Sequence, residues 1–494
     1  MSMKRAILIL LAAALTLQAE LRTDEIFADH MVLQQGREVP ISGTCTGSAA
    51  VEVSFAGQTV QAKISGGEWR AVLQPMQASS EGRAITITQG EEKLVINDVL
   101  VGEVWLASGQ SNMLWRLNQT GDTNSLREPG RPLFRFHHSE PQVHTAAHPY
   151  TNDLKSKLAF GKMFQGTWTA DDVSTRARMS AVGYYFGREL QQQLGVPVGV
   201  IHASLGGSEM MAWMPTMILR QKYKECLSAR WLDSKYISAW VRGRARQNIG
   251  NNLEAPHPYK PAYLFETGIR PWLSFPIAGV IWYQGESDAE IQDMKQNYAL
   301  LRDLISGWRS AFFKSDMPFL MVGLPRINDR SRLRAYWPEF RTIQLMAQQN
   351  IPGVHTLTTI DLGSTNSDVH PPRKLEVGTR LAHLAAAQVY GRDIPFSGPV
   401  VSKVSPAGSE LILHYNHAEG LTTTDGAAPV GFEVSANGKF YHPATAVIKG
   451  STIKLSSPQV PAPKYARYAW VTFMTPNLVN AHGLPAVPYS PTNH

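Results

Sequence analysis

The stretch that decides the expected fold is Val104-Trp-Leu-Ala-Ser-Gly-Gln-Ser-Asn-Met-Leu-Trp-Arg-Leu117. It begins as an apolar strand, turns abruptly between Ser108 and Ser111, and continues with the apolar spacing of a helix. A serine on a sharp strand-to-helix turn projects its hydroxyl from the carboxyl edge of a sheet, beside the free amides of the new helix. Ser111 is therefore in the position expected of a nucleophile.

The glycine pattern here is not the Gly-x-Ser-x-Gly elbow, because the single glycine, Gly109, lies two residues before Ser111. A lone Gly-x-Ser most often marks a plain turn between a buried strand and a helix. The nucleophile hypothesis therefore depends on partner residues elsewhere in the chain.

The composition is that of an ordinary globular protein, with 494 residues, 43% hydrophobic content and a formal charge of +7. No long basic run or basic-aromatic ladder is present, which argues against a nucleic-acid partner. Cys45 and Cys226 are the only cysteines, too few for a disulfide scaffold or a cysteine-built metal site. They could pair between two domains or stay as two buried thiols.

Residues 1–19 have the layout of a secretory signal peptide: Lys4-Arg5, an apolar run from Ala6 to Leu17, and small Ala19 at the expected cleavage site. The apolar run is shorter than the about 20 residues that span a bilayer. No cysteine follows it to carry a lipid, and no later segment is apolar enough for a membrane helix. We therefore expect a periplasmic or secreted protein without a membrane anchor.

The sequence divides into three parts after the signal peptide. Residues 20–98 alternate polar and apolar side chains in short runs separated by glycines, which predicts an antiparallel β-sandwich. Residues 99–395 alternate apolar strands with helical segments, which predicts a parallel sheet covered by helices on both faces, with its ligand site at the carboxyl ends of the strands. Residues 396–494 return to short strands and predict a carboxyl-terminal β module.

The region 218–261 interrupts the strand-helix alternation with aromatic and basic residues. It is expected to be an insertion beside the site, acting as a lid or a substrate wall, or else a helical excursion with a solvated basic face.

Two apolar runs end in polar groups suited to an oxyanion hole. Gly206-Gly207 follows the run from Val198, and paired glycines let a backbone N–H approach a ligand, so Gly207 is the expected donor. Gln284 and Glu286 follow the run that ends at Tyr283. Because an amide can donate whereas an ionised carboxylate only accepts, Gln284 is assigned as a second donor and Glu286 as an orienting or structural residue.

A third run leads into Asp361 and then to Asp368-Val-His370-Pro-Pro372. His370 can take the proton of a serine through one ring nitrogen while Asp368 accepts from the other, the division of labour in a serine triad. Asp361 is the alternative orienting carboxylate.

Two other groups of residues deserve mention. His137, His138, His144 and His148 lie close together in a loop-like stretch, but no carboxylate or cysteine joins them at a regular ligand spacing, so a metal site is not expected. Trp105, Trp115, Trp213 and Trp282 could stack on sugar rings, although core packing is the default for those within strands.

Taken together, four blocks resemble the sialate O-acetylesterase family of SGNH carbohydrate esterases. They are Ser108-Gly-Gln-Ser-Asn-Met113, Gly206-Gly207, Trp282-Tyr-Gln-Gly-Glu-Ser287 and Asp368-Val-His-Pro371, and the likeness runs from Phe27 to about Tyr390.

The resemblance implies an SGNH-hydrolase (flavodoxin-like) three-layer α/β/α domain. It also implies Ser111 as nucleophile, His370 as base, Asp368 as orienter, and an oxyanion hole made of the Ser111 and Gly207 amides with the Gln284 side chain.

The expected activity is removal of O-acetyl groups from a carbohydrate, with sialic acid favoured by the resemblance and with no metal or cofactor. Two alternatives stay open, an esterase for acetylated xylan or another glycan and a non-catalytic carbohydrate-binding protein. The family commonly has Trp-Gly-Gly-Thr and Met-Glu-Trp where this chain has Leu205-Gly-Gly-Ser208 and Met113-Leu114-Trp115. These departures bear on the substrate rather than on the chemistry. The oligomeric state is left open.

Overall fold

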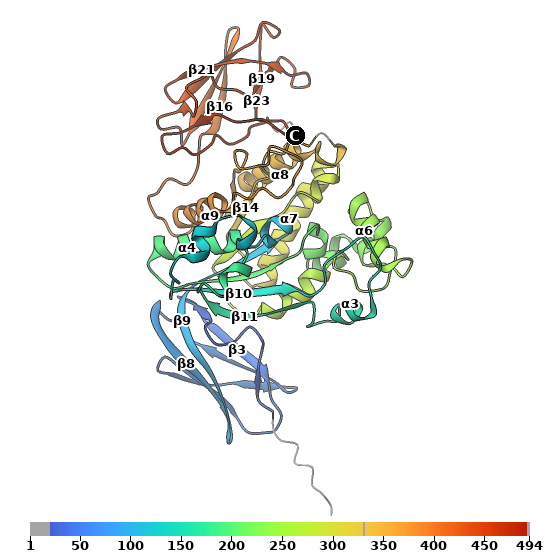
Figure 1. Ribbon diagram of the computed structural model, residues 1–494, viewed down its shortest axis with the longest axis vertical. Coiled ribbons are helices and arrows are strands. Elements are labelled where there is room, and N and C mark those ends of the chain that lie inside the picture. The colour runs from blue at the N-terminus through green and yellow to red at the C-terminus, as the bar shows by residue number, and fades with distance from the viewer. Residues whose placement is uncertain (1–19, 330, 492–494) are drawn as a thin grey trace, which may run out of the picture.

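The computed structural model describes residues 20–329 and 331–491, so the predicted signal peptide lies outside the described residues. The chain has mixed α/β architecture. Amino-terminal strands form one end of the long axis, the helices and the central sheet form the middle, and the carboxyl-terminal strands form the other end (Figure 1).

The amino-terminal strands pair mainly antiparallel and bury alternate side chains. In β4, for example, Val51, Val53 and Phe55 are buried while the residues between them are half-buried, as expected for strands with one face on a core. One sheet has the order β1-β3-β7-β6, and β4 pairs with β5 and β8 in the other. The strands are β1 (Arg22–Thr23), β2 (Val32–Gln34), β3 (Val39–Thr44), β4 (Val51–Phe55), β5 (Gln58–Gln61), β6 (Lys63–Ser65), β7 (Glu68–Leu73) and β8 (Ser79–Gln89).

Strand β9 (Glu92–Gly109) crosses the boundary expected at residue 98. Its first half pairs antiparallel with β8, and its second half pairs parallel with two strands of the central sheet. The pattern of polar and apolar residues does change near residue 98, but a single strand runs through this position. One strand therefore belongs to both parts and aligns the first with the second.

The central sheet has the strand order β11-β10-β12-β9-β13-β14-β15. All its neighbours pair parallel except β11, which pairs antiparallel with β10 at the edge. The predicted parallel sheet is therefore confirmed for the strands that carry the site. The strands after β9 are β10 (Phe134–Pro141), β11 (Phe164–Ala170), β12 (Val198–Ser204), β13 (Gly279–Tyr283), β14 (Phe319–Val322) and β15 (Val354–Leu357).

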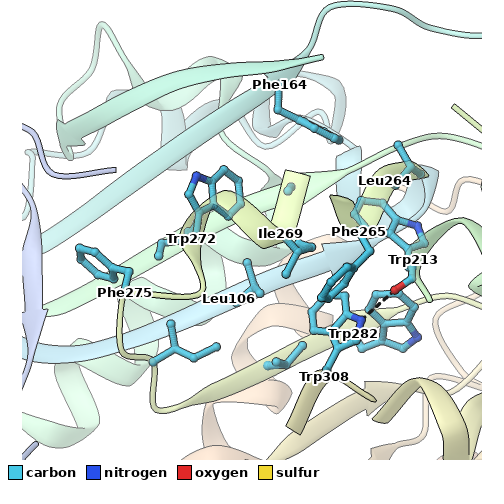
Figure 2. Packing of buried hydrophobic residues seen from close by; sticks show 14 of the residues in the cluster. Leu106, Phe164, Trp213, Leu264, Phe265, Ile269, Trp272, Phe275, Trp282 and Trp308 are labelled. Carbon is cyan, nitrogen blue, oxygen red and sulfur yellow. Dashed lines mark hydrogen bonds between the residues drawn. The ribbon is translucent and has the colours of Figure 1, made fainter. Parts of the chain in front are cut away.

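Alternate residues of the central strands contribute to two separate hydrophobic clusters. Trp105 and Ile281 pack with residues of α4 and α9, whereas Leu106 and Trp282 pack with residues of α7 and α8. Figure 2 shows the second cluster, in which Trp308 donates to the Trp213 carbonyl (2.9 Å) beside Trp282. The helices are α1 (Ser111–Leu114), α2 (Thr123–Arg127), α3 (Asn152–Lys157), α4 (Ala181–Leu194), α5 (Thr216–Lys222), α6 (Ala239–Ile249), α7 (Met294–Ala311), α8 (Trp337–Asn350) and α9 (Lys374–Gln388).

The carboxyl-terminal strands form three small sheets around their own core. Strand β23 ends at Tyr468, because Ala469 has a left-handed backbone (φ +52°) that breaks the extended run. The strands are β16 (Val400–Ala407), β17 (Glu410–Asn416), β18 (Thr422–Thr423), β19 (Phe432–Ser435), β20 (His442–Pro443), β21 (Thr445–Lys449), β22 (Thr452–Ser456), β23 (Tyr465–Tyr468) and β24 (Leu478–Val479).

Among the described residues, no helix combines the length and the apolar character that crossing a membrane requires. Cys45 and Cys226 are both buried free thiols, the second of the two states that the sequence left open.

Candidate functional site

Three central strands end at the same level of the sheet. In the strand register, Gly109 at the end of β9 lies opposite Ser204 of β12 on one side and Tyr283 of β13 on the other. The chain reaches β12 and β13 on opposite sides of β9, and such a switch point opens a crevice at the carboxyl ends of parallel strands. The loops that follow these strands therefore meet at one place.

The turn after β9 is tight enough to require a glycine. Gly109 has φ +134°, and a Cβ atom at this position would lie 2.1 Å from the Tyr283 carbonyl oxygen. Ser111 then opens α1, as expected from the sequence. Within the described part of the chain, the Ser111 backbone N–H donates to no acceptor, so it is available to a ligand.

The Gly206-Gly207 turn lies directly beside this serine. A Cβ on Gly206 would be 3.6 Å from the Cβ of Ser111. Gly207 has φ +71°, and a Cβ there would meet Trp240 at 2.4 Å and the Tyr259 hydroxyl at 2.5 Å. Both aromatic residues come from the 218–261 region, so this region lies beside the Gly206-Gly207 turn.

The Gln284 side chain is buried and already hydrogen-bonded. Its Nε2 donates to the Ser208 carbonyl (2.7 Å) and to Oδ2 of Asp288 (2.5 Å). Asp288 also accepts from the Met210 amide (2.8 Å), so Gln284 ties the loop after β13 to the loop that carries Gly207. The oxyanion role assigned to Gln284 would require one of these bonds to break. Both N–H groups of the Gln284 amide are therefore already used within the protein.

We expect Gln284→Ala to lower the free energy of unfolding by about 1–3 kcal/mol, because two buried acceptors lose their donor. Turnover of a folded fraction should fall much less than the roughly 100- to 1000-fold typical of a lost oxyanion donor. A melting curve and steady-state kinetics on one preparation separate the two roles. A large loss in kcat at an unchanged melting temperature would restore Gln284 to the oxyanion hole.

Glu286 lies in the same loop and is also buried. Its Oε1 accepts a hydrogen bond from Nδ2 of Asn112, the residue after Ser111, and burial raises the pKa of its carboxyl group. Arg334 donates to the backbone carbonyl of Glu286 (3.4 Å) rather than to its carboxylate, so the hydrogen-bond partner of the side chain is an amide.

His370 lies on the loop between β15 and α9, and its ring contacts Trp115, the residue that follows α1. Its ring stacks on Trp115 with centroids 4.8 Å apart and an interplanar angle of 16°. Asp368 Oδ1 accepts from the His370 backbone N–H (2.9 Å) and lies 3.5 Å from Nδ1. Both predicted residues therefore lie together at the site. Among the described residues, no hydrogen bond joins the His370 ring to the Ser111 hydroxyl.

The environment favours neutral His370. Burial and the positive charge of Lys374 lower the pKa of His370, and Asp368 acts in the opposite direction.

The alternative orienter, Asp361, is wrong for this role, because Arg380 holds both of its carboxylate oxygens (2.9 and 2.8 Å). Helix α9 begins at Lys374, after the two prolines.

The other candidate residues lie away from the site or in the hydrophobic core. His137 and His138 lie on β10 rather than in a loop, and the described residues contain no group of three or more metal-type ligands suited to an ion. Trp105, Trp213 and Trp282 are buried packing residues as the default predicted, whereas half-buried Trp115 contacts His370.

Comparisons with known proteins agree with this geometry. The sequence model of the family described as "carbohydrate esterase, sialic acid-specific acetylesterase" matches residues 101–243 and 264–387, more than half of the chain. The chain is 25% identical over 435 residues to sialate O-acetylesterase of Mus musculus, covering 79% of this chain and 77% of that one. It is 25% identical over 422 residues to sialate O-acetylesterase of Homo sapiens, covering 78% and 73%.

A crystal structure of a carbohydrate acetylesterase from Xanthomonas citri superimposes with a TM-score of 0.79 and 28% identity, over 96% of this chain and 100% of that one. The chain therefore belongs to the family of sialic acid-specific acetylesterases among the carbohydrate esterases, and it is an ester hydrolase.

Proposed function

We propose that this chain is a serine O-acetylesterase that removes O-acetyl groups from carbohydrate, with O-acetylated sialic acid as the preferred substrate. One observation carries the proposal: Ser111 and the Gly206-Gly207 turn lie together at the level ends of β9 and β12, and the His370 ring stacks on Trp115, the residue that follows α1. The names of the mammalian relatives support the choice of sugar.

In the proposed first half-reaction, His370 accepts the Ser111 proton while Ser111 Oγ attacks the acetyl carbonyl carbon. The Ser111 and Gly207 amides donate to the oxyanion of the tetrahedral intermediate. Collapse breaks the ester bond, and His370 returns its proton to the departing sugar oxygen, which leaves an acetyl-enzyme. In the second half, His370 takes a proton from water, the resulting hydroxide attacks the acetyl group, and acetate leaves as Ser111 regains its proton.

The proposal includes the SGNH three-layer arrangement of the central domain and an amino-terminal β-sandwich. The two hydrophobic clusters formed by alternate residues of the central strands support the first, since they place α4 and α9 apart from α7 and α8. The paired antiparallel sheets with alternating burial support the second.

Export is also part of the proposal, based on the signal-like pattern of residues 1–19. Amino-terminal sequencing of protein recovered from the periplasm or medium should begin near Glu20. A form that keeps Met1 and is found only in the cytoplasm would contradict export.

The test is acetate release measured across O-acetylated sialic acids, acetylated xylan oligomers and a simple aryl acetate, with Ser111→Ala alongside. We expect the highest kcat/KM on sialic acids, and no release by the variant above background. A higher kcat/KM on xylan oligomers would change the substrate while keeping the chemistry. Binding of glycan without release of acetate from any of them would favour the carbohydrate-binding alternative.

A further inference from the structure

A fully buried amide lies directly beneath the candidate site. Asn112 follows Ser111 in α1, and its Nδ2 donates to the Val369 carbonyl (2.9 Å) and to Oε1 of Glu286. Its Oδ1 accepts from Nζ of Lys374, the first residue of α9. One side chain therefore joins the nucleophile turn, the loop after β13 and the loop that carries His370.

Lys374 is an unusual residue to find in this place. Its side chain is fully buried, with Nζ 5.3 Å from the centroid of the Tyr283 ring at the end of β13. Burying an ammonium group costs free energy, and an apolar side chain of similar volume would often serve packing at least as well. Its position within hydrogen-bond reach of Asn112 therefore suggests a role beyond filling space.

That role follows from what each group can do. A side-chain amide can lie in two orientations that exchange its oxygen and nitrogen. Lys374 can only donate, whereas an ionised Glu286 and the Val369 carbonyl can only accept. Lys374 therefore favours the orientation with Oδ1 toward itself, which leaves Nδ2 for the other two groups. The alternative orientation would turn the amide oxygen toward the Val369 carbonyl and the amide N–H groups toward Lys374, so the lysine adds to the cost of that orientation.

We propose that Lys374 is a positioning residue, which orients Asn112 so that it tethers Val369 and thereby holds His370 in place beside Ser111. The inference extends the proposed function, since it assumes that Ser111 and His370 react together. Among the described residues, Lys374 makes no hydrogen bond with Ser111 or with His370. It acts on His370 through the Asn112 amide and through its own charge.

If Lys374 acts through its charge, its replacement should change the pH dependence of the reaction, which a packing role alone would not do. The charged groups that act on the His370 ring are Lys374 on α9, Asp368 on its own loop and Arg334 on the segment between β14 and α8. Burial and the two cations lower the pKa of His370, while Asp368 raises it. Removing the lysine charge should therefore raise the His370 pKa, and the acid limb of the kcat/KM profile should move to higher pH.

The experiment is Lys374→Met in the full chain, assayed with an aryl acetate over a range of pH. We expect kcat to fall about 10- to 100-fold with KM nearly unchanged, the range set by one lost hydrogen bond to a charged group. The acid limb should move to higher pH. Wild-type kcat together with an unmoved acid limb would overturn the proposal.

Two matched controls separate this role from general effects. Arg373→Met removes a neighbouring charge that is paired with Glu376 at the surface, and turnover and pH profile should stay unchanged. Lys314→Met removes another largely buried lysine, which donates to the Ile277 and Ala278 carbonyls. It should lower the melting temperature without moving the acid limb.

A second variant keeps the proposal testable if Lys374→Met does not fold. Asn112→Asp preserves shape and the acceptor for Lys374 but removes the donor to Val369. The double variant Asn112→Asp with Glu286→Gln should regain the thermal stability that Asn112→Asp loses, because the introduced glutamine amide can donate to the introduced aspartate carboxylate. The kcat of the double variant should stay low. Recovery of both stability and kcat in the double variant would overturn the tether. Ser111→Ala on the same substrate tests the proposed function separately, since its outcome does not depend on Lys374.

Discussion

Ser111→Ala is expected to lower kcat/KM for an aryl acetate about a thousandfold or more while the protein stays folded. The serine opens α1 at the end of β9, and its Oγ makes no hydrogen bond with another described residue that folding would lose. Without Oγ no acetyl-enzyme can form, and the remaining amide donors can assist only direct attack by water. Steady-state hydrolysis and a melting curve check this result.

Ser108→Ala is a matched control for the nucleophile variant. Ser108 lies three residues earlier on β9, and its buried hydroxyl has no hydrogen-bond partner among the described residues. Its replacement should leave turnover close to that of the wild type. A fluorophosphonate should label wild-type protein and Ser108→Ala at Ser111 but should not label Ser111→Ala. Near-normal hydrolysis by Ser111→Ala would remove the nucleophile from the mechanism.

His370→Ala is expected to cause a loss of similar size, about a thousandfold or more, because Ser111 then lacks a base and the leaving sugar lacks an acid. The base works only when neutral, so activity should fall as pH drops through the pKa of His370. Since burial and Lys374 lower that pKa, the acid limb should lie below the ordinary value of 6.5. A pH profile of kcat/KM measures it.

Asp368→Asn measures how much the Asp368 carboxylate contributes to the function of His370. The Asp368 side chain is 57% exposed and its carboxylate lies 3.5 Å from Nδ1, so its field on the imidazole is weakened by water. We expect a smaller loss than for His370→Ala and an acid limb at lower pH, because the carboxylate raises the His370 pKa. An acid limb above pH 6.5 in the wild type would contradict the described environment of the histidine.

Much of the local structure was predictable because it depends on local patterns. The apolar run into Ser111 forms β9 and then α1, as the strand-to-helix pattern predicted. Apolar runs that end in polar clusters also predicted which loops meet, because parallel strands bring their carboxyl ends to one edge. The pattern of side chains near residue 98 could not reveal that one strand, β9, pairs with strands on both sides of the expected boundary.

Residue type and short spacing were enough to predict the family blocks, the strand-turn-helix that presents Ser111, and His370 and Asp368 as its candidate partners. The hydrogen-bond partners of the polar side chains depend instead on how distant segments pack. Asn112 meets Glu286 174 residues away and Lys374 262 residues away, and Gln284 uses its amide on Ser208 and Asp288. A polar side chain carries the capacity to bond, but packing of distant segments selects its partner and thereby decides whether a donor remains free for substrate.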